Sequence, residues 1–81
     1  MIKFAWAGPE DARTCADILL DIEEAGLDVV ESRFFHWTNP KNGAEYNVVC
    51  WSEEQFPDDF DEEAAKAEFF KLLHTEIHLG V

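Results

Sequence analysis

The chain has 81 residues, 47% hydrophobic and 14% aromatic, with 18 acidic and 6 basic residues and a formal net charge of −12. This composition is too apolar for a disordered acidic tail, and the length predicts a single small domain over residues 1–81. The negative charge disfavours direct binding to nucleic acid or to an anionic membrane, and it favours a basic protein surface as partner.

The chain opens MIKFAWAG and soon reaches Glu10 and Asp11, without an apolar run of signal-peptide length. No stretch of the sequence is long and apolar enough to span a bilayer. Cys15 and Cys50 are the two cysteines, which is typical of reduced core residues, although a bridge between them stays an open alternative. We therefore expect a cytoplasmic protein.

Residues 2–7 alternate large apolar side chains with small or polar ones, which predicts a half-buried strand. Pro9 suits the first turn of a helix, so we expect a helix from about Pro9 to Ala25, followed by Gly26 as its C-terminal glycine. Residues spaced three or four apart predict its apolar face: Ala12, Cys15, Ala16, Leu19 and Ile22.

Two segments rich in β-branched and aromatic residues, 28–38 and 45–51, predict a β-hairpin. Asn42 and Gly43 lie between them and tolerate positive φ, which is typical of a tight turn. Phe34 and Phe35 are adjacent and must point to opposite faces, so the register of the hairpin stays open.

The last predicted helix begins near Asp58 or Asp59, with Asp59 as N-cap and Glu62 at the third helical position. We expect it to end between His74 and His78. Its predicted apolar stripe is Phe60, Ala64, Ala67, Phe70, Leu73 and Ile77, widened by Phe69 and Leu72.

The predicted order is β-α-β-β-α, an α+β fold. We expect a two-layer sandwich in which a three-stranded, mainly antiparallel sheet carries both helices on one face, with the third strand between the first two. The net negative charge lies outside the hairpin, because residues 1–28 carry a net charge of −5 and residues 53–81 carry a net charge of −7. One side of the molecule is then expected to be strongly acidic, and the far side of the sheet near neutral and partly aromatic.

Two runs of carboxylates are the candidate partner-binding residues. The first is Asp17, Asp21, Glu24 and Asp28, whose spacing places the first three on one helix face. The second is Glu53, Glu54, Asp58, Asp59, Asp61, Glu62 and Glu63. A helix start explains some of the second run, because carboxylates stabilise the positive end of the helix dipole. We expect reversal of Asp17, Asp21 and Glu24 to Lys to abolish partner binding and leave the fold intact or more stable.

No catalytic or cofactor motif is recognisable, so we expect a protein that is not an enzyme and needs no cofactor. Asp59, Asp61 and Glu63 alternate, but Ala64 and Phe70 stand where a calcium loop requires Gly and Glu. His74 and His78 lie four residues apart, which by itself is weak evidence for a metal, and we predict no metal site.

In size and charge the chain resembles small acidic phage-encoded inhibitors, including anti-CRISPR proteins and DNA mimics, and also acidic immunity proteins and antitoxins. This resemblance implies an inhibitor that docks its carboxylate-rich helices on the basic nucleic-acid-binding surface of a nuclease or CRISPR effector. The alternative is a homo-oligomeric structural domain that pairs through an aromatic sheet face, with Trp6, Phe34, Phe35, Trp37, Tyr46 and Trp51 as candidates.

Overall fold

The computed structural model describes the backbone of residues 2–79 and the side chains of residues 2–74. Its elements are β1 (Lys3–Ala7), α1 (Cys15–Glu24), β2 (Glu31–Thr38), β3 (Glu45–Ser52) and α2 (Glu62–Leu79). The strands form one antiparallel sheet in the order β1-β3-β2. The predicted α+β class, element order and strand order are therefore confirmed. Within the described residues, neither helix has the length and apolar character needed to cross a membrane.

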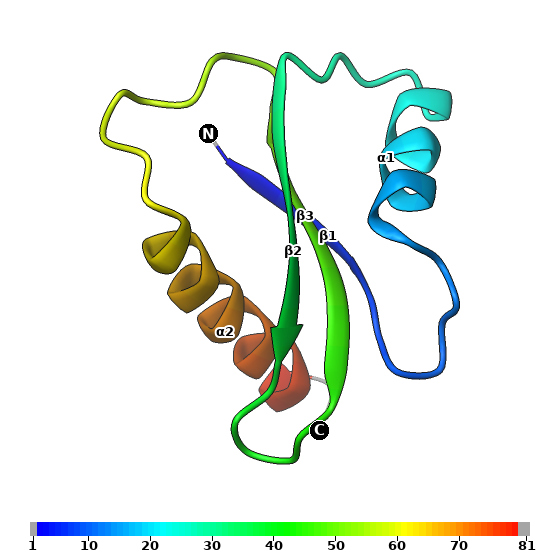
Figure 1. Cartoon of the computed structure of the whole chain (residues 1–81), viewed down its shortest axis with the longest axis vertical. Coiled ribbons are helices and arrows are strands. Elements are labelled where there is room, and N and C mark those ends of the chain that lie inside the picture. The colour runs from blue at the N-terminus through cyan, green and yellow to red at the C-terminus, as the bar shows by residue number, and fades with distance from the viewer. Residues whose placement is uncertain (1, 80–81) are drawn as a thin grey trace.

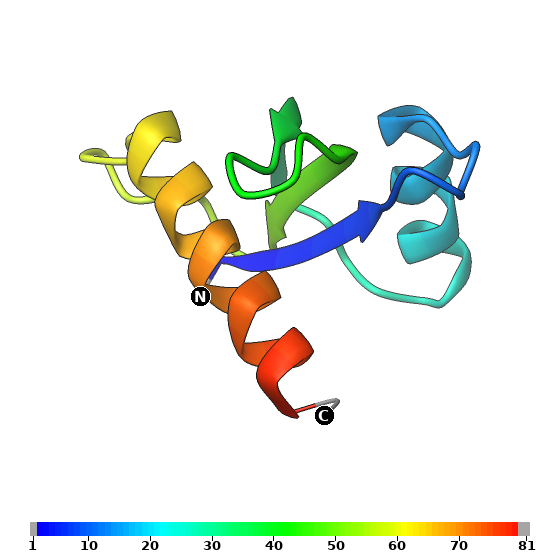
Figure 2. The same ribbon diagram turned by 90° about the horizontal axis from the view of Figure 1, so that it is seen from below.

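The two helices lie on opposite faces of the sheet, and the prediction that both cover one face is wrong. Figures 1 and 2 show α1 and α2 on the two sides of the strands. Alternate residues of β3 pack into two separate hydrophobic cores, one on each face of the sheet. Val48 and Cys50 belong to the core with α2, while Val49 and Trp51 belong to the core with α1. The result is a helix–sheet–helix arrangement in place of the predicted two layers.

Phe69 of α2 forms the centre of the larger core. Its side chain is fully buried and lies against five aromatic rings, with centroid distances between 5.0 and 6.4 Å. These rings belong to Phe4, Trp6, Phe35, Trp37 and Tyr46. Large rings bury much apolar area each, which allows so short a chain to build a core.

The buried stripe of α2 differs from the predicted one. Ala65, Phe69 and Leu73 are buried, whereas Ala64 and Ala67 are exposed. The predicted stripe counted from Phe60, but Phe60 precedes the helix, so the prediction started from the wrong residue. Ile77 and His78 lie outside the residues whose side chains the structure describes.

The smaller core lies between α1 and the sheet. Ile18 and Ile22 are buried there with Ala7, Val49 and Trp51. The helix begins at Cys15, six residues later than predicted, because Thr14 is its N-terminal cap and Pro9 lies before the helix and not in its first turn. Ala12 therefore lies before the helix and Ala16 is exposed, so their placement on the apolar face was wrong. Gly26 follows the helix with φ of 86°, as predicted for a C-terminal glycine.

The hairpin connection is longer than a two-residue turn. Asn39 closes it, since its backbone N donates to Ala44 O at 2.8 Å and its backbone O accepts from Gly43 N at 2.8 Å. Gly43 has φ of 73°, and Asn42 does not take the positive φ that a tight Asn-Gly turn requires. The predicted hairpin is confirmed, but its turn is organised by Asn39.

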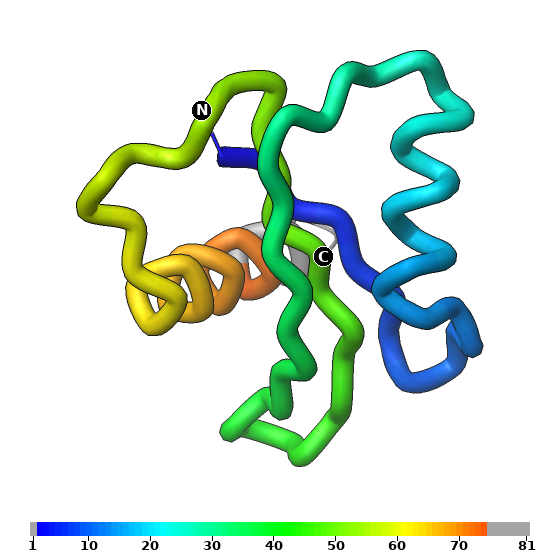
Figure 3. The backbone as a smooth tube through the Cα atoms, turned by 45° about the horizontal axis from the view of Figure 1, so that its top comes forward, coloured from blue at the N-terminus to red at the C-terminus, as the bar shows by residue number. Residues whose placement is uncertain are grey.

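A long connection joins β3 to α2 and carries most of the acidic run (Figure 3). It contains a turn in which Phe60 N donates to Pro57 O at 3.0 Å. Asp61 then caps α2, because its Oδ1 accepts from Glu63 N at 3.1 Å. The helix thus begins later than predicted, and Asp59 is not its N-cap.

Candidate partner-binding surfaces

The predicted binding carboxylates form two groups on opposite sides of the sheet. The helix-1 carboxylates are Asp17, Asp21, Glu24 and Asp28, on α1 and the loop after it. The acidic segment, residues 53–63, leaves the sheet on the side of α2, where its Phe56 and Phe60 join the larger core. Figure 1 shows this segment on the side away from α1. The single acidic side that the sequence predicted does not form, because the two helices cover opposite faces.

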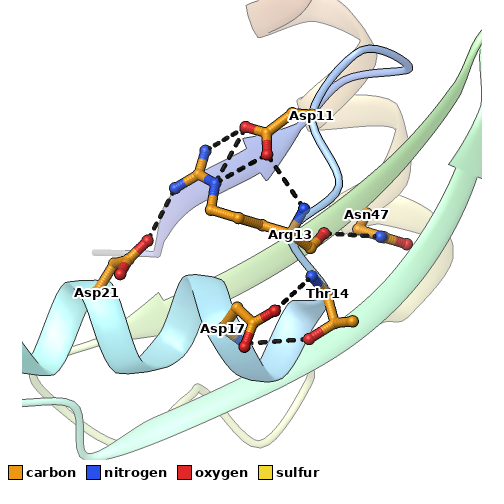
Figure 4. A network of polar contacts seen from close by, with 6 residues as sticks. All are labelled: Asp11, Arg13, Thr14, Asp17, Asp21 and Asn47. Carbon is orange, nitrogen blue, oxygen red and sulfur yellow. Dashed lines mark hydrogen bonds and ion pairs between the residues drawn. The ribbon is translucent and has the colours of Figure 1, made fainter.

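Half of the helix-1 carboxylates are engaged within the fold (Figure 4). Asp17 and Thr14 form a reciprocal capping box at the start of α1. Asp21 accepts a hydrogen bond from Arg13 Nη1 at 3.0 Å, and the same guanidinium contacts Asp11 at 2.7 Å. Among the described residues, Glu24 and Asp28 have no ion-pair partner and are exposed.

Arg13 organises the entry into α1. Its side-chain hydrogen bonds to Asp11 hold the pKa of that carboxyl below its usual value. Its backbone O accepts from Asn47 Nδ2 at 3.0 Å, which ties the loop before α1 to β3. Through these contacts, Arg13, Asp11 and Asp21 stabilise the loop before α1 and the helix itself.

Three of the seven carboxylates in the acidic segment have a lysine nearby. Lys3 Nζ lies 2.8 Å from Glu53 Oε1, and Lys66 Nζ lies 3.9 and 3.6 Å from carboxylate oxygens of Glu62 and Glu63. No lysine or arginine of the described part of the chain lies within 4.0 Å of the remaining four carboxylates, those of Glu54, Asp58, Asp59 and Asp61. All seven carboxylates of the segment are exposed.

Beside the acidic segment lies an open groove of about 510 Å³. Its floor is apolar and consists of Ile2, Phe4, Phe60, Ala64 and Ala65. Pro57, Asp59, Asp61 and Glu68 complete its lining. Sequence reasoning missed this groove. The one available signal was Phe60, a large apolar residue within the acidic run.

The strand aromatics do not form an open face. Phe35, Trp37 and Trp51 are buried, while Trp6 and Tyr46 are half-buried and contact Phe69 of α2. Phe34 alone among the six strand aromatics is exposed, at 45%. Since α2 covers the aromatic face, pairing through that face lacks the surface it requires.

Metal binding and thiol chemistry depend on the His, Cys, Asp and Glu side chains in the described part of the chain. No group of three or more His, Cys, Asp or Glu side chains there is placed to hold a metal ion. Burial raises the pKa of the thiols of Cys15 and Cys50, which disfavours the nucleophilic thiolate. His74 Nδ1 lies 3.5 Å from Lys41 Nζ, and the side chain of His78 is outside the described residues.

No protein-family model matches this chain, and neither the curated proteins nor the solved structures give a significant match.

Proposed function

We propose that this protein is a small inhibitor that acts in the cytoplasm by docking the acidic segment on a basic, nucleic-acid-binding surface of a target protein such as a nuclease or CRISPR effector. The observation that carries the proposal is the run of seven exposed carboxylates within residues 53–63, four of which have no cation within ion-pair distance among the described residues. The helix-1 carboxylates are the secondary contact, because among the described residues only Glu24 and Asp28 there have neither an ion pair nor a capping bond. The acidic segment has three such carboxylates, those of Glu54, Asp58 and Asp59.

Repulsion between like charges in the acidic segment favours a basic partner. Helix-end electrostatics account for Asp61 and Glu62, but like charges at Glu54, Asp58 and Asp59 raise the energy of the free protein. A partner rich in Arg and Lys relieves this repulsion when it binds. A row of carboxylates also presents the charge that a nucleic-acid-binding groove selects for, and such complementary charge speeds association.

The test is a pull-down from host lysate with immobilised full-length protein, washed at low salt and at about 0.5 M salt, where screening is nearly complete. We expect a nucleic-acid-binding protein that is released as salt rises. Recovery of its own chain alone, or of a partner that resists salt, contradicts charge-driven docking.

Matched charge variants locate the contact. The triple variant Glu54→Gln, Asp58→Asn, Asp59→Asn removes three charges from the acidic segment. The control Glu23→Gln, Glu24→Gln, Asp28→Asn removes three charges on the α1 side. We expect the first variant to lose the captured protein and the control to retain most of it. Equal loss in both means that net charge, and not the acidic segment, determines binding.

A further inference from the structure

We propose that the groove beside α2 receives one large apolar side chain of the partner, a tryptophan flanked on both sides by lysine or arginine. The inference rests on the proposed function, because it specifies the chemistry of the segment that the acidic segment binds. It adds an apolar anchor to a contact that carboxylates alone leave unspecific.

The floor of the groove is built from fixed apolar side chains. Phe60 stacks on Phe56 with ring centroids 4.6 Å apart, and the guanidinium of Arg33 lies 5.6 Å from the centroid of the Phe60 ring. Phe4 lies against the buried Phe69, with centroids 6.1 Å apart. An apolar surface that is already fixed costs a ligand little ordering entropy when it binds.

The space exists because α2 presents small residues here. Ala64 and Ala65 occupy the first turns of the helix, where longer side chains would close the gap between α2 and Phe4. The volume of about 510 Å³ falls within the usual range of roughly 300–1,000 Å³ for sites that bind organic groups. Tryptophan is the largest apolar side chain and is enriched among the residues that dominate binding energy at interfaces.

Charge complementarity selects the flanking residues. Asp59 and Asp61 come from the segment before α2, and Glu68 comes from the helix itself. A partner segment that carries carboxylates is repelled here. Lysine or arginine on either side of the inserted apolar side chain is attracted. A second copy of this chain is a poor occupant, since no two of its six basic residues lie closer than five positions in sequence.

Two peptides of equal charge test the anchor, GKKWKKG and GKKSKKG, both acetylated and amidated. Each is titrated into ¹⁵N-labelled full-length protein, and amide shifts are followed. We expect the tryptophan peptide to shift the amides of Phe4, Ala64 and Glu68. We also expect it to bind about tenfold or more tightly than the serine peptide, which is what burial of one large apolar side chain supplies.

Two variants of α2 provide the control. Ala64→Phe fills the groove without a change of charge, and Ala67→Phe places the same ring on an exposed position of α2 outside the groove. We expect Ala64→Phe to abolish the preference for tryptophan and Ala67→Phe to retain it. Circular dichroism verifies that both variants fold.

The outcomes separate the groove from the proposed function. Equal, salt-sensitive binding of both peptides overturns the apolar anchor while docking by charge stands. A preference for tryptophan that survives Ala64→Phe, or no binding of either peptide, also overturns the anchor. A groove-dependent preference together with a failed pull-down supports the anchor and contradicts the inhibitor proposal.

Discussion

Thr14 and Asp17 cap α1 reciprocally. Asp17 N donates to Thr14 Oγ1 at 3.2 Å, and Thr14 N donates to Asp17 Oδ2 at 3.1 Å. The pair satisfies two backbone donors that a helix start otherwise leaves without partners. Asp17 is therefore a structural residue, and reversal of its charge acts on the fold before it acts on any partner.

Asp17→Lys is expected to lower the free energy of unfolding by about 1 kcal/mol, the usual cost of losing a helix cap. Glu24→Lys places a cation at the C-terminal end of α1 and is expected to be neutral or stabilising by a few tenths of a kcal/mol. Urea unfolding followed by circular dichroism measures both variants. Equal effects of the two substitutions contradict the capping role.

Phe69→Ala is expected to cost about 3–5 kcal/mol, because it leaves a cavity among five aromatic rings. A domain of this size has a total stability of only about 5–15 kcal/mol, so this substitution removes a large part of the free energy of unfolding. Leu72→Ala is the control on the same helix, since Leu72 is 39% exposed. Chemical denaturation compares the two, and near-UV circular dichroism reports ring packing. Losses within about 1 kcal/mol of each other would count against the central position of Phe69.

The order of the elements is predictable because its signals come from residues close together in the sequence. These signals are the alternation in the strands, Gly26 after the first helix and the turn residues of the hairpin. The placement of the helices is not local. Val48, Val49, Cys50 and Trp51 form a continuous apolar run, and such a run is typical of a strand covered on both faces. That signal predicts a helix on each face of β3. The predicted two-layer arrangement treated β3 as a strand that is covered on one face only.

The candidate site was predictable in composition and not in geometry. The acidic segment is visible as a run of carboxylates, but the roles of Asp17 and Asp21 depend on Thr14 and on Arg13. The groove depends on contacts distant in sequence, since β1 contributes Phe4 and α2 contributes Ala64. Residue types alone do not indicate that these two elements meet.

The two cysteines are expected to be free thiols of unequal reactivity. Cys50 is fully buried in the larger core, and the half-buried Cys15 packs against the smaller core on the other face of the sheet. Burial raises the pKa of both thiols, so both react slowly with Ellman's reagent in the folded protein. We expect Cys15 to react first, and both to react rapidly in denaturant. Equal rates in the folded state, or fewer than two thiols after unfolding, contradict these placements.

His36 supplies a pH dependence with a defined sign. Its Nδ1 lies 3.1 Å from Asn47 Oδ1 and its Nε2 lies 3.5 Å from Glu45 Oε1. The hydrogen bond with Asn47, then that with Glu45, raises the pKa of His36 above its usual 6.5. The folded state therefore holds this proton more tightly than the unfolded state. The resulting stabilisation is complete below the unfolded pKa and is lost as the pH rises through the folded pKa.

An NMR titration of the imidazole is expected to give a pKa for His36 above 6.5. Glu45→Gln removes the facing charge and is expected to lower that pKa, whereas Glu23→Gln removes a charge on α1 and leaves it unchanged. The difference in unfolding free energy between the native protein and His36→Gln is expected to shrink as the pH rises through the folded pKa. A pKa that ignores Glu45→Gln, or a difference that grows with pH, contradicts the contact, because protonated His36 is then not the form that the fold stabilises.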